Sequence, residues 1–226
     1  MTPYFEQDGI TIYHGDCREV TEWLCADVLV SDPPYGIDWK QGVLNLSGSG
    51  GHAGIANDKD TVVRDAALAL WGTDRPAVLF GSLSLAPPPG TKQVLIYHKP
   101  PDSGARGAMG GFRRDAEAIY LIGQWPSGIG GRSSVLATGA RATGSRHGVA
   151  ARGGHPHSKP LDVMATLIGA TTGLIADPFM GAGSTLVAAK QMGRPAIGVE
   201  LVEEYCETAA KRLSQGVLFP VSEVAL

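Results

Sequence analysis

The sequence predicts an α/β fold in which strands and helices alternate along one chain. Residues 173–201 show this pattern clearly, as an apolar run, a turn with one proline and two glycines, a helical stretch and a second apolar run. Another apolar run, at residues 28–30, ends in the rigid sequence Asp-Pro-Pro-Tyr. With 226 residues, 43% of them hydrophobic, the chain can bury one good core, so residues 1–226 are expected to form a single domain.

The individual elements follow from apolar runs and from helical spacing. Strands are predicted where short apolar runs are bounded by Gly, Pro or polar residues, at 10–13, 28–30, 77–80, 93–97, 116–122, 174–176 and 196–199. Helices are predicted where apolar residues recur at helical spacing, at 17–24, 60–71, 161–169, 184–193 and 203–213. Ser184 can cap the fourth of these helices, and Gly193 can end it.

Two long segments lack this periodicity. Residues 36–60 are rich in Gly and Ser and are expected to form a mobile loop beside the active site. Residues 98–154 are irregular apart from the strand at 116–122, and they are rich in arginine. A segment of this kind inside a compact domain is usually functional or disordered, and its arginines favour a function.

The net charge of -3 hides an uneven distribution of charge. Ten basic and three acidic residues lie between Lys92 and Lys159, whereas the rest of the chain holds nine basic and nineteen acidic residues. A basic segment on an acidic body is typical of an enzyme that binds a polyanion, so residues 98–154 are predicted to be a basic target-recognition insertion. Its candidate nucleic-acid contacts are Lys99, Arg106, Arg113, Arg114, Arg132, Arg141 and Arg146.

The glycine turn at residues 181–183 indicates a nucleotide-type cofactor. Glu200 ends the next strand, where open α/β sheets bind their ligands. A dinucleotide fingerprint needs a third glycine where Leu186 stands, and a P-loop needs a lysine that Gly183-Ser184-Thr185 lacks. What remains is a ligand with a ribose for Glu200 and no phosphate that demands a basic partner. S-adenosylmethionine satisfies this description.

The Asp-Pro-Pro-Tyr sequence at residues 32–35 presents hydrogen-bond acceptors in a fixed direction, because two successive prolines remove two backbone donors and hold the chain extended. Rigid acceptors beside an aromatic ring suit a planar base with an exocyclic amine. The Asp32 carboxylate and a backbone carbonyl can accept the two amine hydrogens, which favours the pyramidal geometry of a nitrogen that attacks a methyl group. Tyr35 can stack on the base. In a duplex the base must first be rotated out of the stack.

The cysteines and histidines of the sequence do not indicate thiol or metal chemistry. The chain has three cysteines, Cys17, Cys25 and Cys206, and this odd number leads us to expect reduced thiols in a cytoplasmic protein. None of the three follows a proline, and we expect them to be inert rather than nucleophilic. His155 and His157 lack an acid or cysteine at ligand spacing, so no metal site is predicted. The sequence has no run of eighteen apolar residues, and its N-terminus does not resemble a secretion signal.

These motifs and their order resemble the β class of amino-group DNA methyltransferases, in which the catalytic motif precedes the cofactor motif. The resemblance covers residues 10–35 and 155–213, and it includes Gly-Asp-Cys, Asp-Pro-Pro-Tyr, His-Pro-x-x-Lys-Pro, Asp-Pro-Phe-Met-Gly-Ala-Gly-Ser and Gly-Val-Glu-Leu. It implies a Rossmann-like, S-adenosylmethionine-dependent methyltransferase fold, with a mostly parallel seven-stranded sheet that contains one reversed strand. The middle of the chain matches only loosely.

The resemblance also implies roles for single residues. Asp32 and the Pro33 carbonyl would hold the target amine, with Pro34 completing the rigid turn and Tyr35 on the base. The implied cofactor contacts begin with Asp16 and Cys17 at the adenine, Ser158 and Lys159 at the carboxylate, and Asp177 near the amino-acid end. They continue with Phe179, Gly181, Gly183 and Ser184 along the glycine turn and Glu200 at the ribose. Members of the family often carry Thr-Gln where His157-Ser158 stands, which weakens the carboxylate assignment.

The function implied is a bacterial or phage-encoded, site-specific transfer of methyl from S-adenosylmethionine to N6 of adenine in duplex DNA, with the target base flipped. Asp32 favours adenine because the N4-cytosine group more often has serine at that place. An N4-cytosine or RNA methyltransferase remains an alternative, as does a nucleic-acid-binding module of the same fold without catalysis. No membrane partner is expected, and the resemblance leaves open a homodimer and a cognate restriction enzyme.

Overall fold

The computed structural model describes residues 1–37, 57–99, 111–125, 131–138 and 158–215. Their strands form one sheet in the order β1-β2-β9-β8-β3-β4-β6-β5-β7. The strand bounds are β1 Phe5–Gln7, β2 Ile10–His14, β3 Val28–Ser31, β4 Ala77–Gly81, β5 Thr91–His98, β6 Ala116–Ile122, β7 Val135–Ala137, β8 Ile175–Asp177 and β9 Ala196–Glu200. All seven predicted strands are therefore present, with bounds shifted by no more than two residues.

The sheet is mostly parallel, as predicted. In the run from β2 to β5 across the sheet, only β6 is reversed, since it pairs antiparallel with both β4 and β5. This is the expected seven-stranded sheet with one reversed strand. Two strands of three residues each extend it: β1 lies antiparallel to β2, and β7 lies parallel to β5. Such short edge strands have no alternation to reveal them in the sequence, and β7 lies in a segment that we expected to be irregular.

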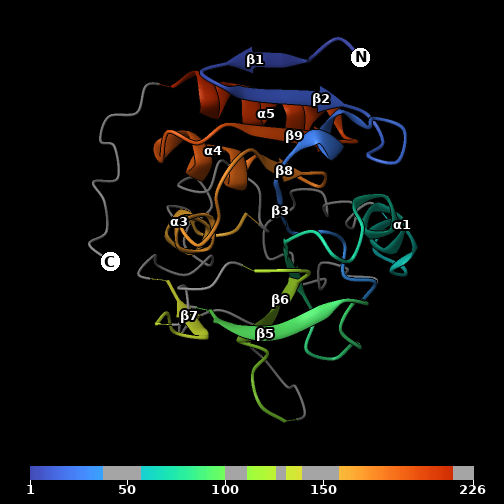
Figure 1. Cartoon of the computed structure of the whole chain (residues 1–226), viewed down its shortest axis with the longest axis vertical. Coiled ribbons are helices and arrows are strands. Elements are labelled where there is room, and N and C mark those ends of the chain that lie inside the picture. The colour runs from blue at the N-terminus through green and yellow to red at the C-terminus, as the bar shows by residue number, and fades with distance from the viewer. Residues whose placement is uncertain (38–56, 100–110, 126–130, 139–157, 216–226) are drawn as a thin grey trace, which may run out of the picture.

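Helices cover both faces of the sheet. Their bounds are α1 Val62–Trp71, α3 Leu161–Ile168, α4 Ser184–Gln191 and α5 Glu203–Ser214, with a 3-10 helix, η1, at Glu22–Cys25. Figure 1 shows α1 and α3 on opposite sides of the strands. The helix predicted over 17–24 is wrong, because residues 17–19 form a turn and only the short η1 follows. Long apolar side chains at 20, 23 and 24 pack in a turn as well as they would in a helix.

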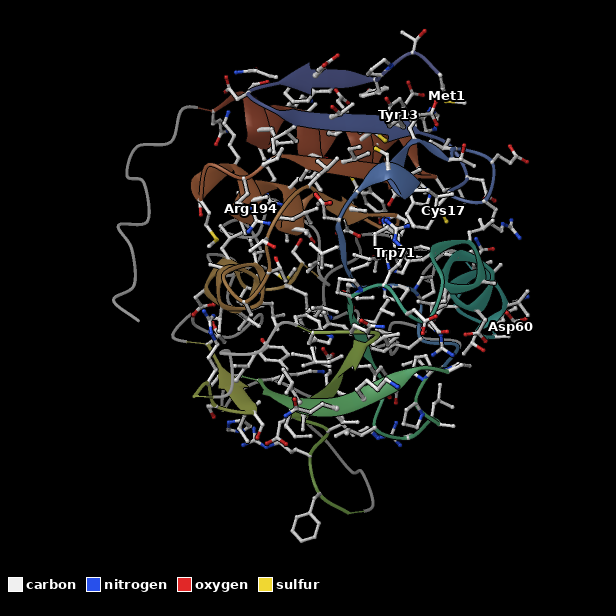
Figure 2. All side chains as sticks on the ribbon, viewed as in Figure 1. Met1, Tyr13, Cys17, Asp60, Trp71 and Arg194 are labelled. Carbon is white, nitrogen blue, oxygen red and sulfur yellow. The ribbon has the colours of Figure 1, made fainter. Side chains whose placement is uncertain are left out.

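The core has two halves because strand residues alternate between the two faces. Val28 and Val30 face α3, α4 and α5, whereas Leu29 faces α1 and η1. In Figure 2, Cys17 and Trp71 lie on the α1 side, and both belong to the core cluster of that side. Strands that are buried on both faces read as continuous apolar runs, which is why β3 and β4 could be found in the sequence.

The start of α4 corrects one expectation. Ser184 is the first residue of the helix rather than its cap, because Gly183 occupies the cap position with φ 78° and no side chain caps the helix. A Cβ at Gly183 would lie 2.9 Å from the Cβ of Ala209 on α5. Glycine is thus required here both for the left-handed backbone and for the close approach of α5.

No helix in the described parts of the chain is long and apolar enough to cross a membrane. Residues 38–56, most of the expected active-site loop, lie outside the described residues, as do 100–110, 126–130 and 139–157 of the expected basic insertion. The division into these segments therefore stays a prediction. The described part of 98–154 includes β6, which lies inside the sheet between β4 and β5.

Candidate functional site

The candidate site lies where two neighbouring strands end and their chains turn in opposite directions. β3 pairs with β8 in parallel, yet β3 leads on to β4 on one side while β8 leads on to β9 on the other. Ligands of open α/β sheets bind beyond the carboxyl ends of strands at such a switch point. The Ser31 hydroxyl at the end of β3 donates to the Asp177 carboxylate at the end of β8, at 2.6 Å. The two predicted motifs therefore meet, although they stand 146 residues apart in the sequence.

The Asp-Pro-Pro-Tyr segment leaves β3 with Pro33 buried and Asp32 partly exposed. One oxygen of the Asp32 carboxylate, Oδ1, accepts the Tyr35 hydroxyl at 2.7 Å. The other, Oδ2, lies 2.8 Å from the Nζ of Lys159, which precedes α3. Both carboxylate oxygens thus have a partner, and each retains a free lone-pair direction for a substrate donor.

A second carboxylate joins this group from β6. The Nζ of Lys159 lies 3.1 Å from the Glu117 carboxylate and 3.0 Å from the Tyr35 hydroxyl. The other Glu117 oxygen lies 2.7 Å from the Nζ of Lys99, which directly follows β5. We call Asp32, Tyr35, Lys99, Glu117 and Lys159 the acid–lysine network. It contains two carboxylates and two ammonium groups, so its formal charges cancel.

The topology of the sheet explains why Glu117 reaches the site. β6 runs antiparallel to β4, so the first residues of β6 lie at the edge where β3 and β4 end. β5 runs antiparallel to β6, and Lys99 therefore emerges at the same edge. Sequence reasoning missed Glu117 as a functional residue. The sequence shows only an acid at the start of an otherwise apolar strand. Whether that acid reaches the site depends on the direction of β6 in the sheet, which the sequence pattern does not give.

Burial and neighbouring charges shift the pKa values within the network. Burial raises the pKa of Asp32; Lys159 opposes this shift, and the like charge of Glu117 adds to it. Against the effect of burial, Lys159 and Lys99 lower the pKa of Glu117 to about 2. Burial works against the Lys159 ammonium, but Asp32 and Glu117 outweigh it and raise the pKa of Lys159. Lys159 therefore keeps its charge at neutral pH, and it is shared between two carboxylates.

The glycine corner lies beside the network, at the ends of β8 and β9. The Glu200 carboxylate accepts the backbone N–H of Gly181 at 2.9 Å and that of Val202 at 2.8 Å. Burial raises the pKa of Glu200. Gly181 has φ 51°, and among the residues that the structure describes, no atom lies within 4 Å of the place where its Cβ would stand. The corner therefore offers open space beside a partly buried carboxylate.

Asp177 supports the turn between the two motifs. It is buried, and it accepts hydrogen bonds from the Ser31 hydroxyl and from the backbone N–H of Phe179 at 3.2 Å. Burial raises the pKa of Asp177 to about 7, in spite of the hydrogen bonds from Ser31 and Thr185. Asp177 is thus a structural link between β8 and β3, and its ionisation is costly.

This link gives a testable pH dependence. Because the pKa of Asp177 is higher in the folded state than in the unfolded state, folding binds a proton between about pH 4 and pH 7. Stability should therefore fall as the pH rises through that window, by up to about 4 kcal/mol from this group. Asp177→Asn should remove this part of the slope. Urea unfolding of both proteins from pH 4 to pH 8 measures the difference, with exposed Asp74→Asn as the control, and equal slopes for all three would contradict the prediction.

The structure places the other predicted cofactor residues around the same edge or beneath it. Asp16 follows β2 and is held by the Arg18 guanidinium, and Cys17 is buried, where burial raises its pKa to about 12. Phe179 remains partly exposed between β8 and α4, whereas Ser158 and Ser184 are buried. Lys159 is the one predicted cofactor residue whose contacts point elsewhere, because it faces Asp32 and Glu117.

The predicted nucleic-acid contacts divide into three groups. Lys99 is engaged with Glu117, and the Arg132 guanidinium donates to the Thr166 and Gly169 carbonyls at the end of α3. Arg113 and Arg114 are exposed just before β6. The remaining three, Arg106, Arg141 and Arg146, lie outside the described residues. Within the described ranges, no group of three His, Cys, Asp or Glu side chains could hold a metal ion.

Comparison with known proteins gives consistent similarities. A family model described as DNA methylase, of the N6/N4 methyltransferases, matches residues 112–211. YubD of Escherichia coli (strain K12), which is named as a methylase, is 29% identical over 215 residues, which cover 88% of each chain. The type II methyltransferase M2.LlaDCHI of Lactococcus lactis subsp. cremoris is 41% identical over 70 residues, 30% of this chain and 26% of that protein. The crystal structure of an M1.HpyAVI–SAM complex has the same fold, with a TM-score of 0.61 at 22% identity over 91% of this chain and all of the other.

Proposed function

We propose that this chain, of which residues 112–211 match the family model of N6/N4 DNA methylases, transfers a methyl group from S-adenosylmethionine to the N6 amine of adenine at specific sites in DNA. The observation that carries the proposal is the meeting of two strand ends. Asp32 leaves β3 and the glycine corner leaves β8, and the Ser31–Asp177 hydrogen bond joins them. A base held at the first and a methyl donor held at the second would be neighbours.

The glycine corner fits the proposed cofactor. The two Glu200 oxygens accept the backbone N–H groups of Gly181 and Val202, which fixes the carboxylate in a direction where it could accept a ribose hydroxyl. The space beside Gly181 allows a ligand to approach the backbone closely, and partly exposed Phe179 offers an apolar wall. We therefore assign Glu200, Phe179, Gly181 and Gly183 to the cofactor. Asp16 and Cys17 are assigned to its adenine end, and Ser158 and Ser184 remain predicted contacts.

When bound, S-adenosylmethionine supplies an electrophilic methyl group on a sulfonium. The residues of this chain orient the acceptor amine, whose lone pair is otherwise delocalised into the base. The Asp32 carboxylate and the Pro33 carbonyl each accept one amine hydrogen, which favours a pyramidal nitrogen. The amine must lose one proton overall, and Asp32, whose pKa burial raises, is placed to receive it. Tyr35 is assigned to stack on the base.

The proposed substrate is duplex DNA with its target base rotated out of the stack. Arg113 and Arg114 are exposed next to β6, on the segment that leads to Glu117. We assign both to phosphate contacts, together with Arg106, Arg141 and Arg146 of the basic insertion. Lys99, which contacts Glu117, and Arg132, which donates to carbonyls at the end of α3, remain predicted contacts. A homodimer and a cognate restriction enzyme remain predictions.

The choice of base can be tested directly. The purified protein is incubated with S-adenosylmethionine that carries a labelled methyl group and with unmethylated duplex DNA, and the nucleosides are then separated. We expect the label in N6-methyladenine. Label only in N4-methylcytosine would overturn the adenine assignment but keep the enzyme class. Parallel reactions with single-stranded DNA and RNA test the duplex preference, and the absence of label from every substrate would contradict the proposed activity.

A further inference from the structure

The Lys159 ammonium lies at the centre of the acid–lysine network and has more than one acidic partner. Its Nζ lies 2.8 Å from Asp32, 3.1 Å from Glu117 and 3.0 Å from the Tyr35 hydroxyl. The Lys159 side chain is only 10% exposed, so its ammonium depends mainly on these partners. Because both carboxylates contact the same nitrogen, their nearest oxygens lie no more than about 6 Å apart, within the range where charges shift each other's ionisation.

We propose that Glu117 is a positioning residue for methyl transfer. Glu117 shares Lys159 with Asp32 and holds the Tyr35 hydroxyl. This inference rests on the proposed function, since it concerns the residues that would hold the target base. Glu117 contacts no reacting atom itself. Its role is to keep Asp32 oriented and basic, because it prevents one lysine from neutralising the Asp32 carboxylate completely.

In the proposed reaction, the Asp32 carboxylate must accept a hydrogen of the target amine. A carboxylate that forms an exclusive, buried pair with an ammonium is a weaker acceptor for a third group, because part of its charge is already balanced. Glu117 draws on the same ammonium, and Lys99 in turn balances the second oxygen of Glu117. Asp32 therefore keeps more of its charge for the target amine than it would in a simple pair with Lys159.

Glu117 also acts on the aromatic ring of the motif. The Tyr35 hydroxyl lies 2.7 Å from Asp32 and 3.3 Å from Glu117, and Lys159 donates to its oxygen. Three polar contacts at one hydroxyl restrict the rotation of the ring, which must be flat against the base to stack on it. Removal of Glu117 would leave this hydroxyl with Asp32 as its only acceptor among the described side chains.

The charged and titratable groups that face Asp32 come from four elements. They are Tyr35 on its own segment, Lys159 before α3, Glu117 on β6 with Lys99 behind it, and Asp177 at the end of β8. Of these, Glu117 raises the pKa of Asp32 and Lys159 lowers it. Replacing Glu117 with a neutral residue removes its negative charge from beside Asp32 and leaves Lys159 to interact more strongly with Asp32. Both changes lower the pKa of Asp32.

The test compares Glu117→Gln with the wild type in single-turnover methylation of duplex DNA between pH 5 and pH 9. We expect a loss of about tenfold in the rate of methyl transfer, with the affinity for DNA unchanged. The acid limb of the rate profile should move to lower pH by about one unit, because ionised Asp32 persists to lower pH. Glu117→Asp keeps the charge and should restore the position of the limb. Glu207→Gln, at an exposed ion pair on α5, is the matched control.

A second measurement keeps this inference separate from the proposed function. NMR titration of carboxyl-labelled aspartate, with the Asp32 signal assigned by its loss in Asp32→Asn, reports the pKa of Asp32 without any DNA. We expect the pKa of Asp32 to be lower in Glu117→Gln than in the wild type, whether or not the wild type methylates any substrate. The absence of methylation by the wild type would contradict only the proposed function. A variant with unchanged Asp32 titration and an unmoved pH profile would overturn the role of Glu117, whether or not its rate had fallen.

Discussion

Replacement of Asp32 by alanine is expected to slow methyl transfer by a factor of about one hundred to one thousand or more, while salt-dependent binding of DNA persists. The expected loss is typical for the removal of one preorganised group that stabilises charge in a transition state. Within the described residues 32–37 after β3, Asp32 is the only acidic residue, and its carboxylate is held in place by Tyr35 and Lys159. The DNA affinity of proteins comes mainly from phosphate contacts, so the affinity expected here should depend little on this carboxylate.

This variant needs a stability control, because it leaves Lys159 with Glu117 as its only acidic partner among the described residues. Loss of one member of a buried ion pair can cost about 3–5 kcal/mol. Unfolding should therefore be measured in parallel, and the rates compared at a temperature where both proteins are folded. Asp74→Asn, on the exposed turn after α1, should match the wild type in rate and binding. If Asp32→Ala kept more than a tenth of the wild-type rate, the catalytic assignment of Asp32 would fail.

Replacement of Lys159 by methionine is expected to cost up to about 3–5 kcal/mol of folding stability at pH 8, because it leaves two partly buried carboxylates without their shared cation. The loss should shrink as the pH falls. Without Lys159, the pKa values of Asp32 and Glu117 in the folded state rise, so folding takes up protons and stability declines as the pH increases. In the wild type, the pKa of Glu117 is lowered to about 2, so its contribution to stability is complete above about pH 4.5 and is lost as the pH falls from there towards 2.

Urea unfolding of Lys159→Met and the wild type between pH 4 and pH 8 gives the difference directly. Lys211→Met is the control, because Lys211 pairs with Glu207 one turn away on the exposed face of α5. Pairs of that kind contribute about 0.3–0.5 kcal/mol, far less than the loss expected for Lys159→Met. A difference between Lys159→Met and the wild type that stayed constant across the pH range would show that the lost stability comes from packing rather than from the paired charges.

The sequence was most informative where local physics leaves few choices. Doubly buried strands such as β3 and β4 appear as continuous apolar runs, and the order of strands and helices follows from such runs and from helical spacing. The turn at 181–183 could be located because glycine is required where the backbone is left-handed. Local rules failed at Ser184, which begins α4 without capping it, and at residues 17–24, where apolar spacing mimics a helix.

By itself, the sequence determined the fold class, the two motifs and their place at strand ends, because each depends on a few neighbouring residues. It did not determine that Lys159 faces Asp32 or that Glu117 completes the network. Those contacts depend on the reversal of β6 between β4 and β5, which brings the start of one strand to the edge where others end. Only the tertiary structure decides this, because the pairing of distant strands is set by the burial of the whole sheet, and no local pattern records it.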